Sequence, residues 1–176
     1  MKKVIIILTL ITAILIYTQI KEDEVVIPDS AIRLRVIPNS NSSQDQNMKN
    51  KVKNYLEKNT YVLLENTNNI DDARNRINDN LENINSSIDH IFKENNYAMS
   101  YDVNFGYNYF PQKKYRKVKY EEGYYESLVV TLGNGEGKNW WCVLFPPLCL
   151  LEAEETSQKE EVEYKFFIKE IIDKYL

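Results

Sequence analysis

An apolar run at the N-terminus separates a membrane-seeking segment from the part of the chain that must fold in water. Val4 to Ile16 is almost unbroken apolar sequence behind a pair of lysines, and the run can be extended to Ile20. It has no polar face, which a helix packed on a soluble core would show. The shorter run suits a signal peptide, and the longer one falls just short of a typical membrane span. We therefore expect residues 1–20 to be a signal peptide or a single-pass signal anchor.

The charges beside this run predict where the rest of the chain lies. The positive-inside rule places the two lysines in the cytoplasm and the remainder outside. Residues 21–30 are charged and contain Pro28, so we interpret them as a linker. Residues 31–176 then form one exported domain of ordinary length, anchored by residues 4–20 if the segment is not cleaved.

Composition narrows the classes of function. The chain has 22 Lys plus Arg against 26 Asp plus Glu, a formal net charge of −4, whereas nucleic-acid-binding proteins usually show a strongly basic footprint. One His and two Cys are too few for an ordinary Cys/His zinc site. A Ser-His-Asp triad would have to use His90, which we expect to be an exposed helix residue. We therefore expect no enzyme, no metal and no other cofactor.

Hydrophobic periodicity predicts the first half of the domain. Residues 31–37 alternate apolar and charged side chains, the pattern of a strand. Two consecutive helices should follow, the first capped by Ser42 or Ser43. The second covers residues 71–93, and its apolar stripe is the clearest periodicity in the chain. We expect this stripe to face the core, the alternative being a seam between subunits.

The second half of the domain is rich in strand-like sequence. Residues 97–110 are dense in Tyr and Phe, and residues 125–132 and 140–145 continue the pattern. Gly133 to Gly137 predicts a turn that would join the last two segments as a hairpin. Residues 161–176 should close the chain as a helix. Because the strands cluster instead of alternating with helices, we expect an α+β fold with a mostly antiparallel sheet.

Three patterns have both a chemical and a structural interpretation. Cys142 and Cys149 should form a disulfide in an exported domain, the alternatives being buried free thiols, a nucleophile or a metal ligand. The glycine-rich stretch before Lys138 resembles a phosphate loop only loosely, because no Ser or Thr follows and the next segment is a strand. The basic cluster at 113–119 could contact anionic lipid or an acidic partner, but a solvated edge strand protected by Lys is favoured.

The segment between Asn139 and Cys149 is the strongest candidate for a binding site. Adjacent strand residues point to opposite faces, so both tryptophans cannot enter a core on one side. Tryptophan is enriched in interface hot spots, and a diproline favours a rigid loop with little ordering cost on binding. We expect the partner contact to be held by the Cys142–Cys149 disulfide and to comprise Trp140, Trp141, Phe145, Pro146 and Pro147.

This segment, NWWCVLFPPLC at 139–149, with LGNGEG at 132–137, resembles the signature of the stage II sporulation protein R family. IRLRVIPNS at 32–40, with Asp45 and Gln46, is similar to that family's opening motif. Phe105-Gly106, Phe110-Pro111, Lys113, Tyr115, Gly123 and Tyr125 resemble its central block. Arg116 and Glu122 depart from the family pattern.

The resemblance implies a sporulation signal in an endospore-forming bacterium. Family members are made in the forespore and exported to the space between forespore and mother cell. There they activate a membrane-embedded, aspartic-type protease of the mother-cell septal membrane, which matures pro-sigma-E. On this interpretation the chain is an activating ligand, which agrees with its export segment and rigid apolar loop. The alternatives are a structural or assembly protein of the spore or cell envelope and, less favoured, an exported hydrolase.

Overall fold

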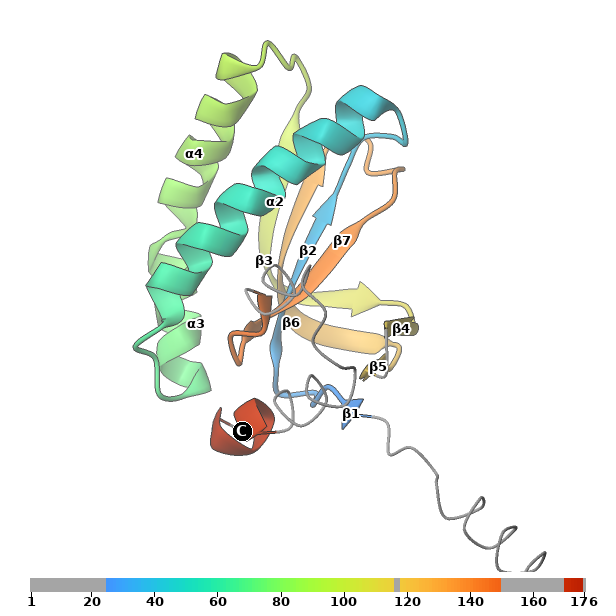
Figure 1. Cartoon of the computed structure of the whole chain (residues 1–176). Helices are drawn as coiled ribbons and strands as arrows, with labels where there is room; N and C mark the ends of the chain where they lie inside the picture. The colour runs from blue at the N-terminus through green and yellow to red at the C-terminus, as the bar shows by residue number, and fades with distance from the viewer. Residues whose placement is uncertain (1–24, 116–117, 150–169, 176) are drawn as a thin grey trace, which may run out of the picture.

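A computed structural model describes residues 25–115, 118–149 and 170–175 of the chain (Figure 1). Its elements follow one another as β1 (Val25–Val26), β2 (Ile32–Ile37), α2 (Ser43–Leu64), α3 (Ile70–Asp79), α4 (Leu81–Glu94), β3 (Tyr101–Phe110), β4 (Lys113–Tyr115), β5 (Val118–Tyr120), β6 (Gly123–Leu132) and β7 (Trp140–Phe145). The expected α+β fold is confirmed. The N-terminal segment 1–20 lies outside the described residues, and no helix among the described residues is long and apolar enough to cross a membrane.

The main sheet has four strands in the order β3-β6-β2-β7, and it is mixed. β3 pairs antiparallel with β6, and β7 antiparallel with β2, but the central pair β2–β6 is parallel. The expectation of a mostly antiparallel sheet is therefore correct only in part. A second sheet, β1-β5-β4, lies at the end of the long β3–β6 ribbon (Figure 1).

The expected hairpin between β6 and β7 is wrong. These strands do not pair with each other, because β2 lies between them. The chain does turn at Gly133 and Asn134, as expected, but residues 133–137 then carry it over the end of β2 instead of joining two paired strands. Alternation along a strand indicates which face is buried, but it does not indicate which strand lies next to it.

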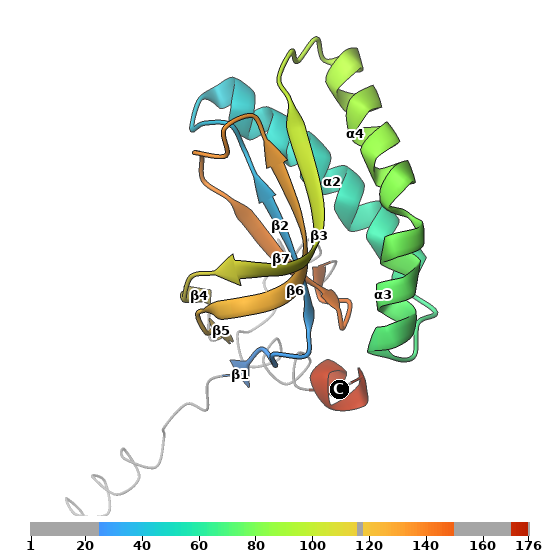
Figure 2. The ribbon, with the colours of Figure 1, turned by 180° about the vertical axis from the view of Figure 1, so that it is seen from behind.

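The helices cover one face of the main sheet, as the two opposite views show (Figures 1 and 2). Ser42 caps α2, its side chain accepting a hydrogen bond from the Asp45 backbone N–H. The single helix expected over residues 71–93 is divided at Asn80, whose φ of −101° and ψ of 0° leave the helical region. The apolar stripe nevertheless continues across the break, and its residues Ala73, Ile77, Ile84 and Ile88 are buried. The stripe faces the core, as expected.

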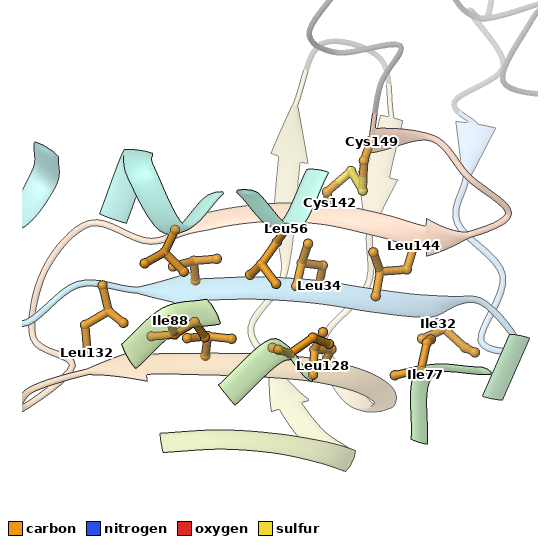
Figure 3. Packing of buried hydrophobic residues seen from close by; sticks show 14 of the residues in the cluster. Ile32, Leu34, Leu56, Ile77, Ile88, Leu128, Leu132, Cys142, Leu144 and Cys149 are labelled. Atoms are coloured by element: carbon orange, nitrogen blue, oxygen red, sulfur yellow. A yellow bond between two sulfur atoms is a disulfide. The ribbon is translucent and has the colours of Figure 1, made fainter. Parts of the chain in front are cut away.

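The core fills the space between these helices and the inner face of the sheet. Leu56, Ile77 and Ile88 from the helices meet Leu34 and Leu128 from the central strands (Figure 3). A smaller cluster forms where the chain ends: Ile171 and Ile172, in the helical residues 170–175, pack against Ile27, Val143 and Leu148. The rest of the expected helix at 161–176 lies outside the described residues.

Candidate partner-binding site

The two adjacent tryptophans of β7 lie on opposite faces of the main sheet, as the sequence predicts. Trp140 turns toward the helices, where the Lys53 ammonium lies 5.2 Å from its ring centroid. Trp141 turns to the other face and packs edge-on against Phe110, with ring centroids 5.3 Å apart. Both tryptophans are half-buried, so each keeps part of its ring accessible.

Trp141 is flanked by two cations. The Arg35 guanidinium lies 5.2 Å from its ring centroid, and the Lys113 ammonium lies 4.7 Å from it. Arg35 donates a hydrogen bond of 3.3 Å to the Tyr109 carbonyl. When the Asn139 amide is oriented with its nitrogen toward the Gly137 carbonyl, its oxygen accepts from Arg35 at 2.6 and 2.9 Å. The Trp141 indole therefore lies between two cationic side chains, one of which, Arg35, is itself held by hydrogen bonds.

The loop after β7 folds back on the strand and is closed by a disulfide. Cys142 and Cys149 are bonded, with their Cα atoms 5.4 Å apart, which confirms the expected pairing. Leu148 donates its backbone N–H to the Val143 and Pro146 carbonyls at 3.2 and 2.8 Å.

Phe145, with 0% exposure, and Pro146 are buried, whereas Pro147 is half-buried. Of the five residues expected to form the contact, Trp140, Trp141 and Pro147 thus expose surface, whereas Phe145 and Pro146 do not.

Arg33 is the residue near this site that the strand pattern did not single out. Alternation places it on the same face as Arg35, yet its side chain is only 1% exposed. Its guanidinium lies 3.3 Å from the Tyr125 ring centroid and 5.6 and 5.8 Å from those of Phe110 and Tyr120. Among the described residues, its three side-chain nitrogens have no hydrogen-bond acceptor. Burial lowers the pKa of Arg33, and the aromatic faces replace part of the lost hydration by cation–π attraction.

The loop that leads into β7 is packed directly on the β2–α2 corner. Asn39 accepts the Asn134 backbone N–H at 2.9 Å through its side-chain oxygen, and its carbonyl accepts from Glu136 at 3.1 Å. Gly137 donates to the Pro38 carbonyl at 3.0 Å. A Cβ on Gly133 or Gly137 would collide with the Asn39 side chain or the Ser40 carbonyl. The glycines are therefore required by close approach, and the loop forms no phosphate cradle opening a helix.

Asp45 holds the same corner from inside. Its carboxylate accepts hydrogen bonds from the hydroxyls of Ser40 and Tyr97, both at 2.6 Å, and from the Asn39 amide at 2.9 Å. These bonds stabilise the charged form and hold the Asp45 pKa at about 2, although burial opposes the shift. Burial, together with this hydrogen bond to Asp45, raises the pKa of Tyr97. Asp45 thus joins the start of α2 to the chain leading into β3.

Comparison with known proteins gives the family. Residues 28–155 match the family model described as stage II sporulation protein R. The chain is 36% identical over 152 residues to stage II sporulation protein R of Bacillus subtilis (strain 168), covering 86% of this chain and 68% of that protein. The chain belongs to the stage II sporulation protein R family. No solved structure matches it.

Three blocks of the family resemblance, far apart in the sequence, meet around Trp141. The opening block supplies Arg33 and Arg35, and the central block supplies Phe110 and Tyr125. The signature block supplies Trp141 itself, paired with Arg35 in the register of β2 and β7. Membership of the stage II sporulation protein R family supports a role in sporulation signalling, and this shared face is its best candidate for a contact surface.

The other residues that the sequence suggested for catalysis, metal binding or partner binding are His90, clusters of possible metal ligands and the basic cluster at 113–119. His90 is on the surface of α4, its ring nitrogen 3.2 Å from the Glu94 carboxylate, with 72% of the side chain exposed. No group of three or more His, Cys, Asp or Glu among the described residues is arranged to hold a metal ion. Of the basic cluster at 113–119, Lys113 and Lys114 lie on β4 and Lys119 lies on β5 of the small sheet. Residues 116 and 117 and the side chains of 114–119 lie outside what the structure describes.

Proposed function

We propose that this chain is exported from the forespore and activates a membrane-embedded, aspartic-type protease in the mother-cell septal membrane, so that pro-sigma-E is matured. The observation that carries the proposal is membership of the stage II sporulation protein R family over residues 28–155. In this role the chain is an activating ligand in the intermembrane space. Residues 4–20 hold it in the forespore membrane or are removed after export.

The surface formed by Trp141 with Arg35, Phe110 and Lys113, called the Trp141 face below, is the proposed contact with the protease. Trp141 combines a large half-buried ring with two neighbouring cations, the arrangement expected of an interface anchor. The disulfide and the packing of Phe145 hold the adjoining loop in place, which reduces the ordering cost of binding. To activate, this face must bind the active arrangement of the protease more tightly than the inactive one, because only differential affinity shifts an equilibrium.

Reconstitution in a non-sporulating host tests the proposal. The chain, the cognate membrane protease and the pro-sigma-E substrate are co-expressed, and shortening of the sigma factor is followed by immunoblot. We expect shortening that requires all three proteins. A chain lacking residues 1–20 should not support it, because without its export segment the ligand stays on the wrong side of the membrane.

A negative result is informative when all three proteins are present and inserted. Lack of shortening under those conditions contradicts direct activation, and it favours a structural role in the envelope. A fluorescent fusion followed through sporulation then distinguishes the two, since a structural protein accumulates in the wall fraction and its deletion leaves sigma-factor maturation unchanged.

A further inference from the structure

The edge strand β3 presents an unusually open surface for a strand of its length. It spans ten residues and pairs only with β6, so no described strand covers its outer side (Figure 2). Natural edge strands are commonly protected by lysine, proline, a bulge or short length. Residues 101–110 contain no Lys or Pro and one charged residue, Asp102 at the start of the strand, and their pairing with β6 runs without a register shift. The strand therefore has the properties of an edge that another strand covers.

The side chains of β3 divide into an apolar and a polar row. On the helix side, every position is aromatic or β-branched: Tyr101, Val103, Phe105, Tyr107 and Tyr109. Tyr107 is 74% exposed and Tyr109 48%, and Tyr109 also contacts the exposed Tyr124 at 5.6 Å between ring centroids. The opposite row is polar at Asp102, Asn104, Gly106 and Asn108 and ends at the buried Phe110.

The two ends of the apolar row differ in shape. The end at Tyr107 and Tyr109 projects into solvent, whereas the beginning of the strand borders an open hollow of about 810 Å³ between α4 and the residues that lead into β3. Phe92 and Lys93 line the hollow from α4, and Met99, 47% exposed, lines it from the chain before β3. One strand thus presents a projecting end and a recessed end.

These features are self-complementary about Phe105. In an antiparallel pairing of two copies with Phe105 opposite Phe105, Tyr101 lies opposite Tyr109, and Val103 lies opposite Tyr107. On the polar row, Asp102 meets Asn108 and Asn104 meets Gly106, so no like charges oppose each other. Aromatic and β-branched cross-strand pairs are the favourable ones. The same register brings the projecting tyrosines of each copy to the recessed end of the other.

We propose that β3 pairs antiparallel with β3 of a second copy of this chain, around a two-fold axis at Phe105, joining the two main sheets into one. The interface is isologous, as in most homodimers. A second copy is the occupant that the two ends of the strand indicate, because an antiparallel copy brings the projecting Tyr107 and Tyr109 of each chain to the hollow beside Met99 and Tyr101 of the other. The inference is independent of the proposed function, since it concerns a different edge of the sheet from the Trp141 face.

Position-specific cross-linking of the full-length chain in host membranes tests the register. Cys142 and Cys149 are bonded to each other, so an introduced cysteine supplies the free thiol for a short bis-maleimide. We expect Phe105→Cys to give a cross-linked dimer by itself. Tyr101→Cys and Tyr109→Cys should give one only when the two variants are co-expressed, because each lies opposite the other. Tyr61→Cys, exposed on α2, is the matched control and should give no cross-linked dimer, because α2 lies away from the paired strands.

A lysine substitution tests the same pairing without added thiols. Tyr107→Lys places a charge in the apolar row at an exposed position, so the monomer fold is spared. We expect the dissociation constant of the detergent-solubilised dimer, measured by sedimentation, to rise about tenfold or more, because two cross-strand pairs are lost at once. Val62→Lys, at another exposed apolar position, should leave it unchanged.

Three results would overturn the proposal. The first is a wild-type chain that sediments as a monomer at every concentration tested. The second is cross-linking that does not depend on the position of the cysteine. The third is a Phe105→Cys chain that cross-links only to foreign proteins, which would mean that another protein's strand occupies this edge.

Discussion

Trp141 is packed on one side of its ring and accessible to solvent on the rest. One edge of its ring packs on Phe110, and Arg35 and Lys113 flank it. A ring held in this way loses little conformational freedom when a partner covers it, and its cationic neighbours favour an approaching anionic or aromatic group. Trp141 is both held in place and accessible, so a substitution at this single position tests the proposed contact.

Replacing Trp141 by Ala should abolish signalling while leaving the fold largely intact. Because the side chain is only half-buried, we expect a stability loss of about 1–2 kcal/mol, below that of a fully buried tryptophan. Sigma-factor shortening in the reconstituted system should fall at least about tenfold, to the level seen without the chain. Trp141→Phe should retain part of the activity by preserving a ring between the cations. Full shortening by a folded Trp141→Ala chain would show that the contact lies elsewhere.

The burial of Arg33 could not be predicted from the pattern of its own strand. The alternation of β2 marks Arg33 as a residue of the polar face, equivalent to Arg35. Its burial is produced by Phe110 and Tyr125, which come from β3 and β6 and are distant in the sequence. Only the folded sheet brings those rings to one guanidinium, so a single-strand pattern could not reveal the cage. The opposite orientation of the two tryptophans, by contrast, is a local property of a strand and was predictable.

At the scale of elements, the glycine loop and the β2–α2 corner behave as one unit. Gly137 donates to Pro38, and Asn39 binds the loop through both its side chain and its carbonyl. This contact sets the path by which the chain leaves β6, passes over the end of β2 and enters β7. The position of the tryptophans therefore depends on a loop that contains none of them.

Gly137→Ala should destabilise the domain by about 1–3 kcal/mol, the usual cost of forcing an extra methyl group into a packed site. The new Cβ would collide with the Ser40 backbone carbonyl, which cannot rotate away as a side chain could, and would lie 2.6 Å from the Pro38 ring. Urea unfolding of the purified chain measures the change. Gly106→Ala is the matched control, because the nearest atom to its Cβ is a side-chain oxygen at 3.9 Å. Equal stability of the two variants would contradict the close packing.

The order of the strands illustrates the limit of prediction at this scale. Periodicity predicts β2, β6 and the apolar faces of α2 to α4, because each of these is a repeat along the local sequence, and the short apolar run at 140–145 predicts β7. It gave the wrong neighbour for β7 because hairpins are the common connection through a glycine-rich turn. The parallel β2–β6 pair arises because the chain after α2 to α4 first runs along β3 in the direction opposite to β2 and then turns back through β4 and β5 into β6. No local repeat records that path. The division between α3 and α4 at Asn80 was missed since the apolar stripe continues across it.

At the scale of the whole molecule, the buried Asp45 connects two segments that are distant in sequence, the β2–α2 corner and the chain before β3. It binds Ser40 and Asn39 at the β2–α2 corner and Tyr97 before β3. Asn39 in turn holds the loop that leads to Trp140 and Trp141. The charge on one carboxylate therefore stabilises both the helical layer and the entry to β7, and the fold as a whole should respond to its protonation.

Asp45 should make the stability of the protein fall steeply in acid. Its pKa is lowered from 3.8 to about 2 in the folded state, so the unfolded chain binds the proton more readily. The contribution of Asp45 is present above pH 4 and is lost as the pH falls through about 2. Asp45→Asn should cost about 1.5–3 kcal/mol at neutral pH, the usual value of hydrogen bonds to a charged group. It should also reduce the fall in the free energy of unfolding, measured in urea, between pH 4 and 2, which is called the acid limb below.

Asp102→Asn, at an exposed position of β3, should leave that limb unchanged. An unaltered acid limb in Asp45→Asn would show that other carboxylates determine the acid sensitivity.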